Sequence, residues 1–378
     1  MKRPRVAMVA PSLDIVGGQG VQAQALLDAL RRDGWDAWRV PIDPAFPTGL
    51  RWLRDLPYAR TLLNEALYLP SLRGLRPADT VHVFSASYWS FLLAPVPAMA
   101  AARRWGKRVV LHYHSGEAED HLGRWGRRVH PWLRLADEIV VPSEYLRDVF
   151  ARHGYRTRVI PNVVDTSSFR FRPRHPLRPR FVSARNFESH YRVDNTLEAF
   201  AIVKRRHPGA TLALAGGGSL EARLRERVFA LGAPDVRFCG RRAPRDMPGF
   251  YDEADVFLNS SVVDNQPVSV LEAFAAGLPV ISTATGDIGR MLRHGDTGLI
   301  VPADDPRAMA SAATWLLERP GEALRMAQRA RKEAEKYSWP AVREAWTETY
   351  LAGAAAALSV RGTPSAAPSS GTASCAAP

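Results

Sequence analysis

Residues 264–281 read Asp264-Asn-Gln-Pro-Val-Ser-Val-Leu-Glu272-Ala-Phe-Ala-Ala-Gly277-Leu-Pro-Val-Ile281. Glu272 is the only charged residue between positions 268 and 281. Because Asn or Asp often caps the start of a helix and Gly often ends one, we predict a helix that begins near Asp264 or Asn265 and ends at Gly277. The apolar residues 278–282 then predict a short buried strand.

Glu272 is therefore placed one or two turns into an apolar helix. A buried carboxylate costs free energy unless a hydrogen-bond donor satisfies it. Either another protein group supplies that donor, or a ligand with paired hydroxyls, such as a ribose diol, does. A third interpretation stays open from this stretch alone: the side chain reaches out of the core to water or to an arginine.

The composition is that of a globular protein long enough for two domains, with 378 residues, 46% hydrophobic and 24% charged. Two cysteines, Cys239 and Cys375, cannot build a disulfide framework, and no Cys/His spacing suggests zinc. The apolar run 6–10 behind the basic N-terminus is too short for a signal sequence, and no run approaches the ~20 apolar residues of a membrane span. We therefore expect a cytoplasmic protein.

The net charge is +13, and residues 1–175 carry most of the excess, with 26 Lys and Arg against 16 Asp and Glu. A basic half attracts anionic surfaces: nucleic acid, acidic lipid headgroups or polyanionic substrates. The alternative is a general use of Arg in a GC-rich genome. Nucleic-acid binding would rest on charge alone, so we do not expect it.

Strand patterns alternate with helical patterns along the whole chain, which implies parallel βαβ units. In the first half we predict a helix over 21–32 and strands over 5–10, 38–42, 80–84, 108–113 and 138–141. In the second half we predict strands over 181–184, 211–215, 236–239 and 256–259, and helices over 196–205, 220–231, 308–318, 322–334 and 339–357.

The Pro/Arg-rich stretch 171–180 is the best linker candidate. It separates a predicted N-terminal domain over 1–170 from a predicted C-terminal domain over 181–338. We expect a closing helix over 339–360 to return to the N-terminal domain. The Pro/Ser/Ala-rich stretch 361–378 predicts a disordered tail.

An ordered series of motifs resembles the retaining glycosyltransferases of family 4, which have the GT-B fold. Asp264 and Glu272 stand eight apart like the paired acidic residues of that family, with Asp in place of its usual first Glu. Four further stretches are similar to its motifs: Ile160-Pro-Asn-Val-Val-Asp165, Leu214-Ala-Gly216-Gly-Gly218, and the pair Thr285-Gly-Asp-Ile-Gly289 and His294-Gly-Asp-Thr-Gly-Leu-Ile-Val-Pro302, which resemble its Gly-rich loop and closing strand. The resemblance spans roughly residues 5–350. It implies an α/β fold of two Rossmann-like parallel-sheet domains that face a cleft.

In such enzymes a nucleotide-sugar donor binds mainly on the C-terminal domain and an acceptor mainly on the N-terminal one. Arg185 matches the family's phosphate-binding Arg, although a surface Arg is the simpler interpretation. The family's Lys, about five residues further on, is missing, and Tyr191 falls on its position. Arg192, beside it, is our candidate for the second cation. The resemblance implies that Asp264 binds hydroxyls of the transferred sugar and that Glu272 binds the ribose.

Gly17 and Gly18 lie between a strand and a helix, where backbone amides can approach a phosphate or sugar closely. An ordinary tight turn is the alternative. The series Gly17-Gly-Gln-Gly20 does not form the fingerprint of a dinucleotide site, so we expect no such cofactor. By resemblance, the remaining candidate donor-binding residues are Gly216, Gly218, Asn265, Gln266, Pro267 and Val268.

His114 ends a predicted strand and takes the place of the family's cleft histidine, near the transferred sugar. His112 lies two residues earlier and therefore shares its face of the sheet, so the residues alone allow either one to be functional. A histidine at a strand end is otherwise often a satisfied polar group. By resemblance we assign the site role to His114, as a hydroxyl ligand or an aid to proton movement.

The combined prediction is a glycosyltransferase that moves a hexose-type sugar from a nucleotide diphosphate to a glycan, lipid-linked or small-molecule acceptor. Retention of configuration is implied by the resemblance. We expect no metal site and no cofactor, the nucleotide-sugar being a substrate. Two alternatives are a non-catalytic nucleotide-sugar-binding protein and a sugar-nucleotide epimerase. Arg and Trp also mix in three segments, 50–60, 103–108 and 124–128, which suits either contact with an anionic membrane surface or a solvated basic face.

Overall fold

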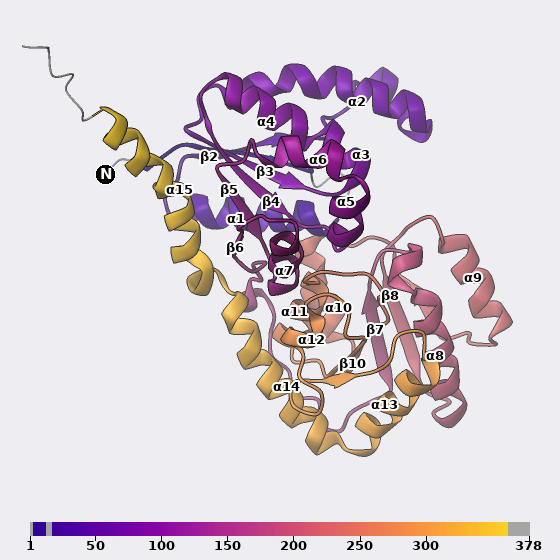
Figure 1. Cartoon of the computed structure of the whole chain (residues 1–378). Coiled ribbons are helices and arrows are strands. Elements are labelled where there is room, and N and C mark those ends of the chain that lie inside the picture. Colours follow the sequence, from indigo (N-terminus) through magenta and orange to yellow (C-terminus); the bar gives the residue numbers. More distant parts are fainter. Residues whose placement is uncertain (1–2, 13–16, 362–378) are drawn as a thin grey trace, which may run out of the picture.

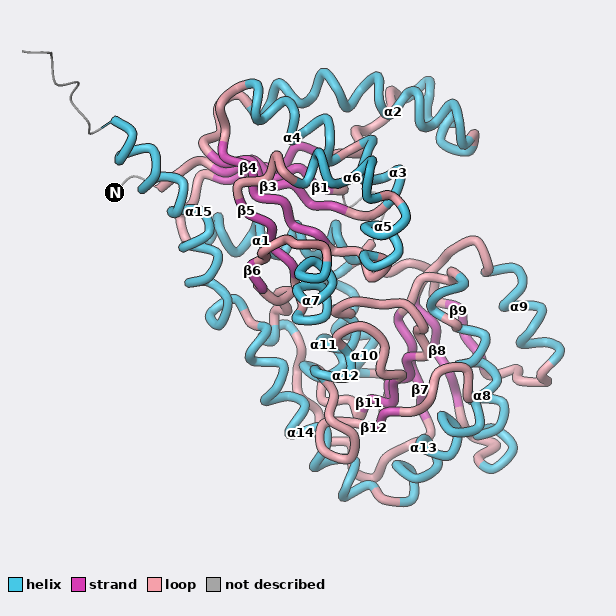
Figure 2. The backbone as a smooth tube through the Cα atoms, in the orientation of Figure 1, coloured by secondary structure: helices cyan, strands magenta, loops and turns pink. Residues whose placement is uncertain are grey.

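The computed structural model describes residues 3–12 and 17–361. The chain forms two lobes, each a parallel six-stranded sheet flanked by helices. Figure 1 shows the N-terminal lobe in indigo and purple and the C-terminal lobe in pink and orange, and Figure 2 shows one sheet in each lobe. The predicted tail over 361–378 lies outside the described residues from position 362 onward.

The first sheet has the strand order β2-β1-β3-β4-β5-β6, and each neighbouring pair is parallel. Its strands are β1 Val6–Ala10, β2 Ala37–Pro41, β3 Thr80–Ser85, β4 Arg108–Tyr113, β5 Glu138–Val141 and β6 Arg158–Val159. Its helices are α1 Gly18–Arg32, α2 Pro57–Ser71, α3 Tyr88–Leu93, α4 Pro95–Arg104, α5 Ala118–Arg124, α6 Gly126–Leu133 and α7 Glu144–Arg152, with the 3-10 helices η1 Thr48–Asp55 and η2 Leu72–Leu75.

The second sheet has the order β12-β11-β10-β7-β8-β9, again all parallel. Its strands are β7 Arg180–Ala184, β8 Thr211–Ala215, β9 Val236–Phe238, β10 Val256–Asn259, β11 Val280–Ser282 and β12 Leu299–Ile300. Its α-helices are α8 Val193–Arg206, α9 Glu221–Ala230, α10 Met247–Asp252, α11 Val268–Ala275, α12 Ile288–Met291, α13 Pro306–Glu318 and α14 Pro320–Ala334. The 3-10 helices are η3 Thr166–Ser168, η4 Ser189–Tyr191, η5 Pro244–Asp246 and η6 Glu335–Tyr337.

The last helix, α15 Trp339–Arg361, leaves the C-terminal lobe and packs on the other one. Val342, Trp346 and Tyr350 are buried in the same apolar cluster as Val6 and Met8 of β1. Figure 1 shows α15 running alongside the N-terminal lobe after α14 has covered the C-terminal one. Burial of these side chains ties the end of the described chain to the sheet that begins it.

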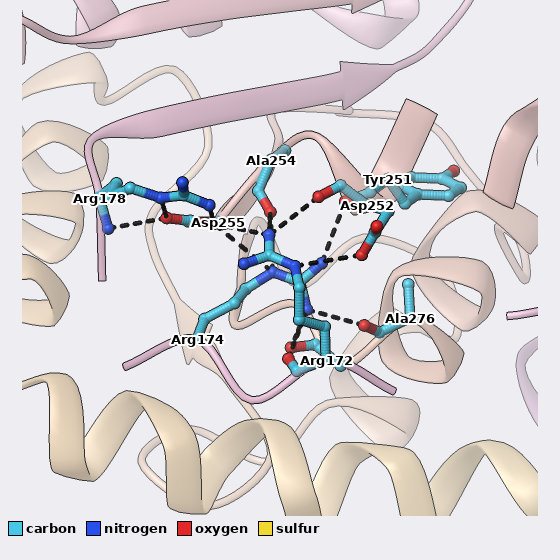
Figure 3. Close-up of polar contacts among 9 residues, drawn as sticks. Arg172, Arg174, Arg178, Tyr251, Asp252, Ala254, Asp255 and Ala276 are labelled. Atoms are coloured by element: carbon cyan, nitrogen blue, oxygen red, sulfur yellow. Dashed lines mark hydrogen bonds and ion pairs between the residues drawn. The ribbon is translucent and has the colours of Figure 1, made fainter. Parts of the chain in front are cut away.

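The stretch 171–180 joins the two sheets but is not a free tether. Arg174 is only 2% exposed, and its guanidinium donates to carbonyl oxygens at the C-terminal ends of α10 and α11. The acceptors are Tyr251 O at 3.0 Å, Ala254 O at 2.7 Å, Ala276 O at 2.8 Å and Gly277 O at 2.9 Å. Figure 3 shows Arg174 among Tyr251, Ala254 and Ala276. The last carbonyls of a helix lack intrahelical donors and favour a cation. Arg174 therefore fastens the connection to the helix that carries Glu272.

The prediction for the start of the helix over 264–277 is wrong by three or four residues, because α11 begins at Val268. Pro267 lies at its N-terminal boundary without a side-chain cap. Asn265 and Gln266 use their side chains elsewhere, in contacts with the other lobe described below. Gly277 ends the helix as predicted, at φ +73°.

Of the three Arg/Trp segments, only 50–60 exposes its tryptophan strongly. Trp52 on η1 is 61% exposed. Trp105 and Trp125 are partly buried and pack against the main apolar cluster of the N-terminal lobe. For those two segments the interpretation with tryptophan packed inward is therefore the one the structure supports.

Candidate active site

A cavity of about 650 Å³ lies between the lobes, where the carboxyl ends of the strands in both sheets converge. The segments that follow β1, β3 and β4 line one side, and those that follow β7, β8, β9 and β10 line the other. In open parallel sheets, ligands bind in the crevice outside the carboxyl ends of the strands. Most of the predicted site residues lie here: Gly17, Gly18, His114, Arg185, Gly216, Asp264, Asn265, Gln266, Pro267, Val268 and Glu272.

Arg185 follows β7 and is held on three sides. Its Nε donates to Asn259 Oδ1 at 2.8 Å, and its terminal nitrogen lies 3.0 Å from Asp264 Oδ2. The guanidinium also lies over the ring of Tyr191, 5.5 Å from the ring centroid. Its side chain is 9% exposed. The site thus presents a fixed cation on the cavity wall, suited to an anionic ligand group.

Glu272 lines the cavity from the second turn of α11. Its Oε2 accepts a hydrogen bond of 2.9 Å from the hydroxyl of Tyr251 on α10. Burial raises the pKa of Glu272 to about 7, while Tyr251 and Arg185 oppose that rise. A protein donor, the Tyr251 hydroxyl, therefore satisfies one oxygen of the Glu272 carboxylate. Because Glu272 lines the cavity, the other oxygen is available to a ligand.

The backbone of Asp264 is clamped between the lobes by two glycines. A Cβ added to Gly116, which follows β4, would lie 2.7 Å from the carbonyl oxygen of Asp264. One added to Gly286, in the other lobe at φ +58°, would lie 2.3 Å from that oxygen. Neither position has room for a side chain. Asp264 is thereby held at the point where both lobes meet, with its carboxylate on Arg185.

His114 reaches the cavity, whereas His112 does not line it. The His114 ring stacks on Phe84 with centroids 5.1 Å apart and lies 4.0 Å from the His112 ring. Its buried Nε2 has no hydrogen-bond partner among the described residues. Burial lowers the pKa of His114 to about 3, so the imidazole is neutral near pH 7. A neutral ring can donate or accept a hydrogen bond but brings no charge to the site.

Arg192, predicted as the second cation, does not line the cavity. Its backbone lies in the left-handed region at φ 48°, at the position immediately before α8. Its Nε lies 2.6 Å from Asp304, and a terminal nitrogen lies 3.8 Å from Asp194. The guanidinium of Arg192 is therefore paired with these two carboxylates outside the cavity.

Two arginines that the sequence analysis missed line the cavity instead. Arg241 and Arg242 lie in the loop after β9. Gly240, at φ +65°, turns the chain just before them. The signal in the sequence is an Arg pair at the carboxyl end of a predicted strand, which is where parallel sheets place ligand-binding groups. These side chains are the structure's candidates for the missing second cation.

Asn265 and Gln266 line the cavity, and their side chains also form hydrogen bonds with Ser143 and Asn162. Gln266 Oε1 accepts from the backbone amide of Asn162 at 2.7 Å, and Asn162 Nδ2 donates to Gln266 O at 2.8 Å. The hydroxyl of Ser143 donates to Asn265 Oδ1. Ser143 belongs to the N-terminal lobe, so this loop joins the lobes as well as lining the cavity.

Gly216 and Gly218 differ in position. Gly216 lines the cavity at φ +154°, and a Cβ there would lie 1.9 Å from the carbonyl oxygen of Arg185. Gly218 does not line the cavity, and a Cβ there would lie 2.6 Å from Phe187 O. Packing against Phe187 and Glu188 by itself requires glycine at this position.

Replacing Gly216 with alanine should lower the free energy of unfolding by on the order of 3 kcal/mol, because both the backbone angle and the contact with Arg185 forbid a Cβ. Thermal or chemical unfolding measures the effect. The matched control is Gly217→Ala, whose added Cβ would meet nothing closer than Arg241 Nε at 3.4 Å. Equal stability of the two variants would contradict the conclusion that position 216 has no room for a Cβ.

Within residues 3–12 and 17–361, no group of three or more His, Cys, Asp or Glu side chains is placed to hold a metal ion. None of the helices described is both long enough and apolar enough to cross a lipid bilayer.

Two facing parallel-sheet lobes with a cavity between them define the GT-B fold, as predicted. Sucrose-phosphate synthase from Thermosynechococcus elongatus shares it at a TM-score of 0.72 and 19% identity, covering 94% of this chain and 100% of that one. Anabaena Alr3699/HepE, solved in complex with UDP-glucose, has a TM-score of 0.70 at 17% identity with the same coverage.

The family models extend the likeness from fold to sequence. The model "Glycosyltransferase Family 4" matches residues 16–168, and "Glycosyl transferases group 1" matches residues 166–333. Glycogen synthase of Mycobacterium tuberculosis is 28% identical over 321 residues, 79% of this chain and 75% of that protein. The GDP-mannose-dependent alpha-(1-6)-phosphatidylinositol monomannoside mannosyltransferase of the same organism is 30% identical over 259 residues, 62% and 66% of the two chains. The chain belongs to glycosyltransferase family 4.

Proposed function

We propose that the protein transfers a sugar from a nucleoside-diphosphate donor, held on the C-terminal lobe, to an acceptor held on the N-terminal lobe. One observation carries the proposal: a fixed guanidinium, Arg185, and a carboxylate, Glu272, line the same wall of one cavity. The guanidinium suits the diphosphate, and the carboxylate oxygen not bound by Tyr251 suits a ribose hydroxyl. Membership of the family and the likeness to glycogen synthase and a mannosyltransferase support the same conclusion.

The reaction breaks the bond between the sugar C1 and the leaving phosphate oxygen and forms one between C1 and an acceptor hydroxyl oxygen. Negative charge builds on the diphosphate, where Arg185 and the backbone amides of Gly17 and Gly18 at the start of α1 would stabilise it. The leaving phosphate oxygen takes the proton of the acceptor hydroxyl on the same face of the sugar. That course gives retention of configuration and needs no protein nucleophile, in keeping with the ion pair that holds Asp264 on Arg185.

Nucleotide affinity tests the donor site. Titration calorimetry with UDP, GDP, ADP and dTDP should find one preferred base. Its diphosphate should bind at least about tenfold more tightly than its monophosphate, because the second phosphate adds a charge-assisted contact. Equal affinity for both would contradict the diphosphate role of this wall. We further propose that catalysis needs neither metal nor cofactor, so excess EDTA should leave turnover unchanged. Proton NMR of the anomeric position in donor and product decides whether configuration is retained.

We also propose a peripheral contact with an anionic membrane surface through η1 and the start of α2. Exposed apolar and basic side chains alternate there, and they support this location: Trp52 is 61%, Tyr58 88% and Leu62 73% exposed, beside exposed Arg51 and Arg60. Aromatic and Leu side chains flanked by arginines suit the headgroup region of a bilayer. A lipid-linked acceptor would be reached from such a position.

Sedimentation with vesicles tests the membrane contact. The protein should bind phosphatidylglycerol vesicles more strongly than phosphatidylcholine vesicles. An Arg51→Ala, Arg60→Ala double variant should bind the anionic vesicles about tenfold or more weakly, since each Arg near such a surface contributes about 1 kcal/mol. Arg245→Ala, an exposed arginine on η5 of the other lobe, serves as control. Failure to bind phosphatidylglycerol at low salt would contradict the proposal.

A further inference from the structure

The two walls of the cavity differ in charge. Among the described residues that line it, Arg185, Arg241, Arg242, Asp264 and Glu272 all come from the C-terminal lobe. The lining residues of the N-terminal lobe include one charged group, Glu117, together with His114, whose lowered pKa keeps it neutral. A ligand group on the N-terminal side therefore meets a carboxylate, and it meets no cation among the described residues of its own wall.

An exposed indole stands on this same wall. Trp89 on α3 lines the cavity and is 62% exposed, with its ring perpendicular to Trp125 at 5.4 Å between centroids. Tyr88, just before it, holds the left-handed backbone angle φ 54°, which is costly for an aromatic residue. The Tyr88 hydroxyl donates to Asp120 on α5 and secures this turn. A strained backbone beside a cavity points to a functional constraint on where Trp89 lies.

Hydroxyl-binding groups lie beside the indole. The hydroxyl of Ser87 donates to Glu117 Oε2 at 3.1 Å, and the hydroxyl of Ser115 donates to Ser87 Oγ at 3.0 Å. The backbone amide of Glu117 in turn donates to Ser115 Oγ at 3.2 Å. This series of hydrogen bonds holds the Glu117 carboxylate through one of its oxygens. Because the side chain is exposed at the cavity, its other oxygen can accept hydrogen bonds from a ligand.

We propose that this wall is an acceptor subsite for an uncharged sugar ring, which stacks on Trp89 and donates hydroxyl hydrogens to Glu117. The inference rests on the proposed function and names the substrate class of its acceptor side. A sugar ring has a face of C–H groups that packs on the negative face of an indole, and a rim of hydroxyls that a carboxylate binds strongly. A phosphate or carboxylate on that ring would face Glu117 at short range, without a compensating cation among the described residues that line this wall.

Acceptor competition tests the proposal with the full-length enzyme and the donor identified by nucleotide release. Methyl and p-nitrophenyl glycosides of glucose, galactose, mannose and N-acetylglucosamine are compared with the matching sugar 6-phosphates and uronides. Neutral glycosides should be used, or should bind to the nucleotide-loaded enzyme by saturation-transfer NMR, in preference to the charged forms. Preference for the phosphorylated or uronic forms, or failure of every neutral glycoside to bind, would overturn the proposal.

Two variants separate the subsite from the rest of the enzyme. Trp89→Ala should lower kcat/KM for the neutral acceptor about tenfold or more, with donor hydrolysis and nucleotide affinity within about twofold of wild type. Glu117→Gln should also lower kcat/KM for the neutral acceptor. It should reduce the ratio of kcat/KM between neutral and negatively charged acceptors. The matched control is Trp52→Ala, an equally exposed tryptophan outside the cavity, assayed with soluble acceptors. Equal behaviour of the two tryptophan variants contradicts the subsite. Loss of nucleotide binding by the wild-type protein would instead contradict the proposed function itself.

Discussion

An Arg185→Ala variant should release nucleotide from its donor about a hundred- to a thousandfold more slowly than wild type. Removing one preorganised charge from the developing negative charge of a transition state has an effect of this size. Here the loss is reinforced, because the Asp264 carboxylate, with a side chain only 12% exposed, would lose the guanidinium that pairs with it. The measurement is kcat for nucleotide release at saturating donor, with unfolding curves to confirm that the variant folds.

Arg192→Ala is the control for this prediction. Arg192 lies seven positions further along the chain but pairs with Asp304 and Asp194 outside the cavity. We therefore expect kcat to change by less than about threefold, the range for a surface arginine whose ion pairs contribute little. If Arg192→Ala abolished turnover while Arg185→Ala did not, the assignment of the diphosphate cation would be reversed.

A Glu272→Gln variant should bind the donor nucleotide about ten- to a hundredfold more weakly at pH 8, a loss of roughly 1.5–3 kcal/mol for hydrogen bonds to a charged group. In wild type the affinity should rise as the pH increases from 6 to 8, because the carboxylate that accepts the ribose hydroxyls forms as Glu272 passes its pKa of about 7. The variant has no such group, so its affinity should be flat over this range. Calorimetry at pH 6, 7 and 8 tests both statements.

The free energy of unfolding gives an independent check, because it should change with pH in the opposite direction to the nucleotide affinity. The pKa of Glu272 is raised from 4.5 to about 7 in the folded protein. The protonated side chain therefore favours the folded state below pH 4.5, and that contribution is lost as the pH rises through 7. Relative to wild type, Glu272→Gln should gain stability without ligand between pH 5 and 8 while losing nucleotide affinity. Unchanged affinity at pH 8 would remove the ribose role, whatever the stability.

Strand alternation and strand-end motifs predict much of the fold because the buried parallel strands are short apolar runs, and several of them are followed by segments that line the cavity. The predictions over 108–113, 138–141, 211–215 and 256–259 coincide with β4, β5, β8 and β10. One strand was missed, β6 Arg158–Val159, which has only two residues at the edge of a sheet and is too short for any periodicity to show. The equally short β12 Leu299–Ile300 lies within 294–302, where the family resemblance predicted a closing strand.

Some residues of the candidate site could be predicted from the sequence and others could not, and the difference has a physical cause. Residues directly after a strand, such as Arg185 and His114, were predicted to lie in the cavity, because a parallel sheet fixes where its strands end. Side chains whose direction depends on a distant counter-charge were not predictable. Arg192 turned to Asp304, and Arg174, in a stretch interpreted as a linker, turned inward to helix carbonyls. No local pattern shows where those acceptors lie.

The clamp on Asp264 is a further feature that only the fold reveals. Gly116 and Gly286 belong to different lobes and are far apart in the sequence, yet both close on the same peptide group. A glycine motif shows that close approach is needed but not what approaches. In this case the approach joins the N-terminal lobe to Asp264, the residue that holds Arg185.

The measurement that tests the central claim most directly is nucleotide release from a panel of UDP-, GDP-, ADP- and dTDP-sugars, followed with wild-type enzyme and with Arg185→Ala. The account predicts that wild type binds one donor and releases its nucleoside diphosphate, slowly with water and faster with a neutral glycoside, and that Arg185→Ala releases almost none. A wild-type protein that binds no sugar nucleotide, or one whose turnover survives the loss of Arg185, would contradict it.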